Sequence, residues 1–191
     1  VLLFSLAAVT CSAGLAQSMP VESSRIVSFG LGAGVSVPVG DAKDAFNNGF
    51  NGQGFLRLNL NWLPIVPRLD FTFQKFDLNS TQFTGPNAIS GGTQSMLAGV
   101  ANFEIPLIRG PVQPYLVAGV GAYNVKRELD DPSAPSESQT KFGINGGAGL
   151  IVKLGIVSLY VEGRVDNVYT DTGVIDTKSI QVVPVTFGLV Y

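Results

Sequence analysis

The final segment of the chain alternates between two kinds of side chain, and this pattern constrains the fold more than any other feature. In an extended strand over residues 180–191, one face is mostly apolar and ends in aromatic residues: Gln181, Val183, Val185, Phe187, Leu189 and Tyr191. The other face is small and mixed, because successive side chains of a strand point to opposite sides. A strand with an apolar outer face and a small or polar inner face is typical of a transmembrane β-barrel.

The same period of two recurs in earlier segments. Besides 180–191, we expect strands over residues 25–39, 53–63, 68–76, 93–105, 114–126, 140–153 and 156–168. The connections alternate in length, as in barrels with short periplasmic turns and longer outward loops. The pattern predicts an all-β fold, an eight-stranded antiparallel up-and-down transmembrane β-barrel with both chain ends on the periplasmic side. Pro184 has no N–H for the barrel ladder, so we expect a bulge or a missing hydrogen bond there.

Several charged residues fall on the same strand face as a column of glycines. They are Arg57, Asp70, Glu104, Glu162, Arg164 and Asp166. Charges and glycines together indicate the polar lumen of a small, tightly curved barrel. An eight-stranded barrel is just wide enough to be filled by side chains, and buried charges must be paired. We therefore expect a structural network in the lumen, with Arg57 near Asp70. The alternative is a gated or narrow pore.

The N-terminal segment has the composition of an export signal. A short apolar run is followed by small residues up to Ala16, which predicts a signal peptide over residues 1–16, truncated at its start, and a periplasmic lead-in over 17–24. The barrel domain is expected over 25–191. The single cysteine, Cys11, lies in the predicted signal, so we expect no disulfide chemistry in the mature chain.

Several short motifs along these strands resemble one known family. They are Gly30-x-Gly32-x-Gly34, Pro38-Val-Gly-Asp41, Gln113-Pro-Tyr115 with Gly119-x-Gly121, Glu162-x-Arg164 and the closing residues 184–191. Together they resemble the outer-membrane β-barrel domain family, in the eight-stranded group of the OmpA transmembrane domain and OmpX. The resemblance implies that the barrel-assembly machinery recognises Phe187 and Tyr191. The final tyrosine stands where phenylalanine is commoner, and no peptidoglycan-binding domain is expected after the barrel.

Composition argues against several functions. A net charge of −2 gives no basic patch for nucleic acid, and the sequence has no histidine, which enzymes on small outer-membrane barrels use as a base. Acidic residues in the connections could bind Ca²⁺, namely Asp130, Asp131, Glu137, Asp171 and Asp176. Their spacing does not match that of a calcium-binding loop. We therefore expect no catalytic, metal or cofactor site. A set of aromatic residues indicates a membrane-facing girdle: Trp62, Phe71, Phe73, Phe103 and Tyr191.

The sequence as a whole predicts a monomeric protein of the bacterial outer membrane. Its role would be structural, or would involve surface interactions through the outward loops. The expected partners are outer-membrane lipids and, during biogenesis, periplasmic chaperones and the barrel-assembly machinery. A narrow channel or carrier for small solutes or apolar molecules is one alternative. A soluble, secreted, lipocalin-like ligand-binding barrel is another, because alternation alone does not say which face is outside.

Overall fold

The computed structural model describes residues 25–40, 47–60, 62–77, 92–129, 137–169 and 179–191. Within these ranges the chain forms β1 (Val27–Val39), β2 (Gly49–Leu58), β3 (Val66–Asp77), β4 (Gly92–Pro106), β5 (Val112–Leu129), β6 (Glu137–Lys153), β7 (Ser158–Tyr169) and β8 (Ser179–Val190). No helix in the described ranges is long and apolar enough to span a membrane. The predicted signal peptide and lead-in lie outside the described residues.

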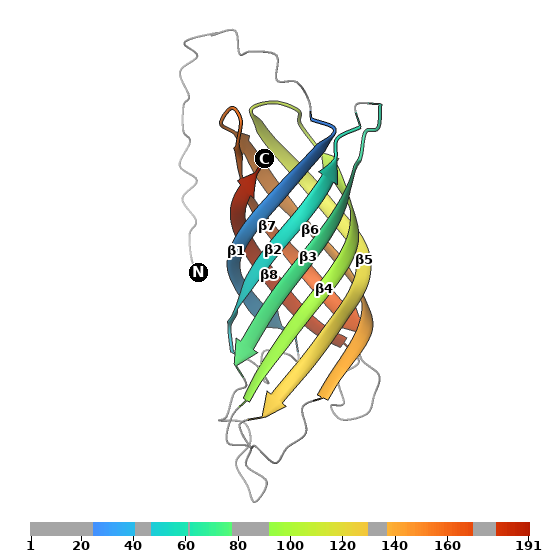
Figure 1. The fold of residues 1–191 in the computed structure, drawn as a ribbon, viewed down its shortest axis with the longest axis vertical. Coiled ribbons are helices and arrows are strands. Elements are labelled where there is room, and N and C mark those ends of the chain that lie inside the picture. Colours follow the sequence, from blue (N-terminus) through green and yellow to red (C-terminus); the bar gives the residue numbers. More distant parts are fainter. Residues whose placement is uncertain (1–24, 41–46, 61, 78–91, 130–136, 170–178) are drawn as a thin grey trace, which may run out of the picture.

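The strands form a closed antiparallel barrel in sequence order, which confirms the predicted fold class (Figure 1). Each strand pairs with its neighbours along the chain, and β1 closes the sheet by pairing with β8. Closure continues one residue beyond β8, since the Phe29 and Tyr191 backbones exchange N–H···O bonds of 3.0 and 2.8 Å. A closed sheet has no edge strand, so every ladder position can find a partner without water.

The barrel has two different ends. The short connections 59–65, 107–111 and 154–157 lie at the same end as the C-terminus (Figure 1). We call this the periplasmic end and the opposite one the outward end, following the usual arrangement of short turns and long loops. The shortest turn closes with a 3.0 Å bond from the Leu154 N–H to the Val157 carbonyl, and Gly155 adopts a φ of 95° there. Glycine fits this left-handed conformation because it has no Cβ.

The two faces of the sheet have opposite character. Side chains on the inner face include fully buried carboxylates, with Asp70 and Glu104 at 0 % exposure, whereas Leu31 and Phe187 on the outer face are 65 % and 60 % exposed. A water-soluble barrel places its apolar face inside. The lipocalin-like alternative is therefore wrong, and the outer face is suited to a bilayer.

One predicted strand was misplaced. The second strand begins at Gly49 and ends at Leu58, rather than covering residues 53–63. It continues toward the outward end because Phe50 and Asn51 keep the alternation, Phe50 exposed and Asn51 buried. It ends early because the chain turns after Leu58, with a 2.9 Å bond from the Leu63 N–H to the Leu60 carbonyl.

Pro184 interrupts one ladder without shifting it. The β7–β8 pairs run to Gly163↔Val185 and resume at Asp166↔Val182, in an unchanged register. Of the two predicted outcomes, a bulge or a missing hydrogen bond, the structure shows the second. Since proline lacks the N–H, β8 loses ladder bonds to β7 here while it remains paired with β1 through Ser36↔Pro184.

Candidate functional site

All the charged residues predicted to face the lumen lie on the inner face and are buried. Their exposed fractions are 7 % for Arg57, 0 % for Asp70 and Glu104, 2 % for Glu162, 3 % for Arg164 and 1 % for Asp166. They come from the neighbouring strands β2, β3 and β4 and from β7, which lies across the lumen from them. Arg68 on β3, also buried, joins them. These side chains form the lumen charge network.

Arg68 is the centre of this network. Its Nε and one terminal nitrogen donate to the two carboxylate oxygens of Asp70, at 2.8 and 2.9 Å. Its guanidinium also donates to both oxygens of Glu162, at 2.6 and 3.1 Å. The guanidinium carbon lies 3.8 Å from the centre of the Phe55 ring, a cation–π contact. We did not single out Arg68 as a site residue from the sequence, although its position two residues before Asp70 puts both on one face.

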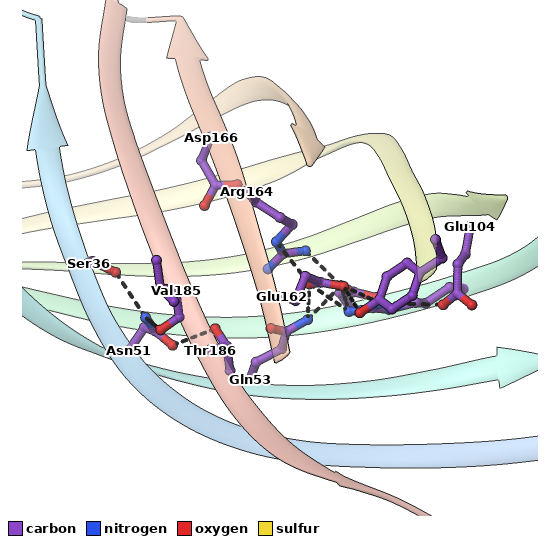
Figure 2. Close-up of polar contacts among 12 residues, drawn as sticks. Ser36, Asn51, Gln53, Glu104, Glu162, Arg164, Asp166, Val185 and Thr186 are labelled. Carbon is purple, nitrogen blue, oxygen red and sulfur yellow. Dashed lines mark hydrogen bonds and ion pairs between the residues drawn. The ribbon is translucent and has the colours of Figure 1, made fainter. Parts of the chain in front are cut away.

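Asp70 and Glu162 receive further donors from other strands. Arg164 donates to Asp70 at 2.7 Å and lies 3.4 Å from Glu162. The Gln53 amide donates to both carboxylates at 3.1 Å, and the Tyr115 hydroxyl donates to Glu162 at 2.8 Å. The two carboxylates therefore tie β2, β3, β5 and β7 together across the lumen (Figure 2). Buried carboxylates with this many charged and neutral donors meet the conditions under which buried ion pairs are tolerated.

The predicted Arg57–Asp70 contact is wrong. The register of β2 and β3 places Arg57 opposite Arg68 and Phe55 opposite Asp70. Arg57 instead reaches β4 and pairs with Glu104, whose other oxygen lies 3.6 Å from Arg68. Two facing arginines therefore share Glu104, because like charges at adjacent positions need a common counter-ion.

A neutral polar chain runs nearer the outward end. Thr186 donates to the Asn51 amide oxygen at 2.9 Å, and Asn51 donates to the Ser36 hydroxyl at 3.3 Å. Ser36 donates to Gln74 at 2.9 Å, and Gln74 donates to Asp166 at 2.8 Å. The chain crosses the lumen from β8 to β7, as Figure 2 shows in part.

Apolar side chains pack in the lumen on both sides of the polar layer. Toward the periplasmic end they are Phe55, Tyr115, Val117, Ile151, Tyr160 and Val190. Toward the outward end they are Phe76, Met96, Ala98, Val100, Tyr123, Val168 and Val182. Along β7 the inner face therefore passes from Tyr160 through the charged residues to Val168. Buried polar and apolar side chains therefore line the lumen along this path.

The glycine column gives these rings their space. A Cβ at Gly30 would overlap the Phe55 ring, and one at Gly149 would overlap Tyr115. A Cβ at Gly32 would overlap the Tyr160 hydroxyl. From the sequence we explained the column by strand curvature; the structure adds that large aromatic side chains occupy the space above the glycines, with Phe55 and Tyr115 each opposite its glycine on the adjacent strand.

The terminal tyrosine is held by side chains near the start of β1. The Tyr191 ring centroid lies 5.3 Å from that of Phe29, and the Arg25 guanidinium carbon lies 3.9 Å from the centre of the Tyr191 ring. Phe187 points outward from β8 and is exposed. The seam between the first and last strands thus closes with an aromatic and cationic contact at the periplasmic end.

The outer surface is apolar, with aromatic residues among its exposed side chains. The predicted girdle residues are all exposed: Trp62, Phe71, Phe73, Phe103 and Tyr191. At the outward end the outer face becomes polar. There the Lys126 ammonium lies 2.5 Å from Glu128, and its hydrogen bond and charge lower the pKa of Glu128. Among the described residues, no group of three or more acidic, histidine or cysteine side chains is placed to hold a metal ion.

Comparison with known proteins agrees with this geometry. The family described as "Outer membrane protein beta-barrel domain" matches residues 4–191. No curated protein sequence is significantly similar to the chain. Neisserial surface protein A has the same fold, with a TM-score of 0.63 and 15 % identity over 87 % of this chain and 96 % of that one.

Two further solved structures share the fold. A major outer membrane protein from Thermus thermophilus has a TM-score of 0.60 and 17 % identity over 87 % of this chain and 99 % of that one. The second is Ail, the attachment invasion locus protein of Yersinia pestis, solved with the heparin analogue sucrose octasulfate. It has a TM-score of 0.56 and 17 % identity over 86 % of this chain and 96 % of that one. The chain belongs to the outer membrane protein β-barrel family and is a bacterial outer-membrane protein.

Proposed function

We propose that this member of the outer membrane protein β-barrel family is a monomeric, closed barrel with a structural or surface-interaction role. Its lumen is held by a polar side-chain network, and its contacts with other molecules are made through the outward connections. The observation that carries the proposal is the pairing inside the lumen. Arg68, Asp70 and Glu162 are almost fully buried and hydrogen-bonded to one another and to residues of other strands.

This pairing argues against catalysis by the lumen charges. A general acid or base needs a free approach to its substrate. Both oxygens of Asp70 and both of Glu162 already accept hydrogen bonds, and apolar side chains pack on either side of them. The same packing argues against the channel alternative, since an eight-stranded barrel has little interior volume beyond its own side chains.

The charge of the outward connections suggests the kind of surface partner. The segments 41–46, 78–91, 130–136 and 170–178 contain six aspartates and two lysines. Ail was solved with a polyanionic heparin analogue. Polyanions require a positive surface, because complementary charge governs encounter and partner choice. We therefore propose a cationic or neutral partner for this chain, in contrast to a heparin-like one.

Biogenesis supplies the remaining proposed partners. We infer that the barrel-assembly machinery recognises the closing strand through Phe187 and Tyr191, after periplasmic chaperones have delivered the unfolded chain. The support is that Phe187 is exposed on the outer face and Tyr191 closes the seam with Phe29. Outer-membrane lipids then cover the apolar belt.

The role can be tested by complementation. A strain lacking the protein would be given either the full chain or a trimmed barrel in which the four outward segments are replaced by short Asn-Gly turns. Sensitivity to detergent and to a large antibiotic would measure envelope integrity. Rescue by both proteins supports a structural role, and rescue by the full chain alone supports a surface interaction. A normal envelope in the deletion strain, together with unchanged adhesion to abiotic and cell surfaces, would contradict both.

A further inference from the structure

The buried charges of the lumen do not balance. In the described part of the chain, the fully or nearly fully buried charged side chains are four carboxylates and three guanidinium groups: Asp70, Glu104, Glu162, Asp166, Arg57, Arg68 and Arg164. The arginines make their ion pairs with the first three carboxylates. One negative charge, on Asp166, is left without a cationic partner at ion-pair distance. Buried charges are retained in proteins when they are paired or when they coordinate a cation.

The geometry of Asp166 leaves one oxygen free. Its Oδ2 accepts a 2.8 Å hydrogen bond from Gln74, whereas its Oδ1 has no hydrogen-bond partner. The guanidinium of Arg164 makes its ion pairs with Asp70 and Glu162 (Figure 2), and beyond ion-pair distance it is also the main positive charge near Asp166. The nearest basic residues on the inner faces of β5 and β6 are Arg127 and Lys141, which lie farther toward the outward end and are partly exposed.

Two neutral oxygen-bearing side chains face the same region without partners. Asn145 lies directly across from Asp166 in the β6–β7 ladder, is 7 % exposed, and neither of its amide atoms makes a hydrogen bond. The Tyr123 ring lies against Gly143, two residues from Asn145 on β6, and its hydroxyl approaches the Asn145 amide without reaching good hydrogen-bond geometry. Asn102 on β4 also has a buried amide with neither atom paired, so the feature that points to a ligand here is the position of Asn145 opposite a carboxylate without an ion pair.

We propose that Asp166, Asn145 and Tyr123 form a binding site for a monovalent cation of the sodium type. The carboxylate Oδ1, the amide oxygen and the phenol oxygen are its protein ligands, and water completes the coordination. Hard cations bind oxygen ligands, and a single positive charge matches the single uncompensated carboxylate. The cation completes the charge balance of the lumen network at its outward side.

Stability measurements on the folded barrel in detergent test this proposal. A ligand that binds only the folded state raises the folding equilibrium constant by a factor of 1 + [L]/Kd, about 100-fold at a hundred times Kd. We expect such a rise when sodium replaces N-methyl-D-glucamine at constant ionic strength. Asp166→Asn should fold, and its stability should no longer depend on the sodium concentration. Asn145→Ala should need a higher sodium concentration for the same rise in stability. Asp77→Asn, which changes an exposed acid on β3, should keep the sodium dependence.

A direct measurement separates binding from stability. Sodium-23 relaxation of the folded barrel in detergent should be enhanced by the wild type and should fall to the free-ion value with Asp166→Asn. An equal sodium dependence of stability in wild type and Asp166→Asn would overturn the proposal, as would sodium-23 relaxation that the wild type leaves unchanged. Stability that rises as the pH falls, with no sodium dependence, would also overturn it, because a proton would then neutralise Asp166. The proposed surface role is unaffected by any of these results, since it depends on the outward connections.

Discussion

Replacing Arg68 with methionine should destabilise the barrel more than any other change of a single arginine. The substitution keeps much of the side-chain volume and removes four hydrogen bonds to two buried carboxylates, all between 2.6 and 3.1 Å. Removing one partner of a buried ion pair costs about 3–5 kcal/mol, because a charge is left uncompensated. Asp70 keeps Arg164 and Glu162 keeps Tyr115, so we expect the lower end, about 3 kcal/mol.

The assay is urea unfolding of the barrel in lipid vesicles, followed by the fluorescence of Trp62, the single tryptophan. Arg109→Met is the matched control. Arg109 lies in a periplasmic turn, where its one side-chain hydrogen bond to a described residue is a 3.3 Å bond to the Leu63 carbonyl, and an exposed charge contributes about 0–1 kcal/mol. Adding Glu162→Gln to Arg68→Met should restore part of the loss by removing an unpaired charge. Equal unfolding free energies for the two single variants would refute the account of Arg68 as the centre of the network.

Three other predictions follow from the packing, the outer face and the closing strand. Gly32→Val should destabilise the barrel by about 2 kcal/mol or more, because the new Cβ would overlap Tyr160 and the backbone of Phe187. Gly99→Ala has open space around the new Cβ and should change the stability little. Urea unfolding compares the two variants, and equal losses of unfolding free energy would show that the glycine column is not needed for packing. On the outer face, Phe71→Arg should lower the unfolding free energy by about 2–4 kcal/mol, whereas Asn124→Arg near the outward end should lower it by about 0–1 kcal/mol. Similar losses for the two variants in the same assay would argue against a membrane belt at Phe71. Deleting residues 187–191 should abolish the heat-modifiable band in the outer-membrane fraction, and an unchanged band would exclude the assembly role of Phe187 and Tyr191.

The sequence predicts the faces of the strands better than the contacts between them. A period of two assigns each residue to the inner or the outer face, so the burial of Arg57 and Asp70 follows from alternation alone. Which residues meet across the lumen depends on register and shear, and these depend on how the connections and the closing seam align all the strands. The contact expected between Arg57 and Asp70 failed for this reason.

The centre of the network was missed for a related reason. Arg68 begins the predicted third strand, where alternation gives the weakest signal, and only the closed barrel brings it within reach of Glu162 on β7. The glycine column was recognised, but its role as the surface on which Tyr115 and Tyr160 lie depends on side chains from other strands. The start of β2 was missed because Asn and Gly residues there resemble a turn.

Planar-bilayer recording of the purified wild-type protein tests the central claim most directly. A lumen filled by ion-paired and apolar side chains should give no steady single-channel steps in potassium chloride, with the same background as protein-free bilayers. Arg164→Ala, which removes one of the donors to Asp70, is the matched variant in which a leak would first be expected. Steady steps from the wild-type barrel that Arg164→Ala abolishes would contradict the account, because the charge network would then line a conducting path instead of closing it.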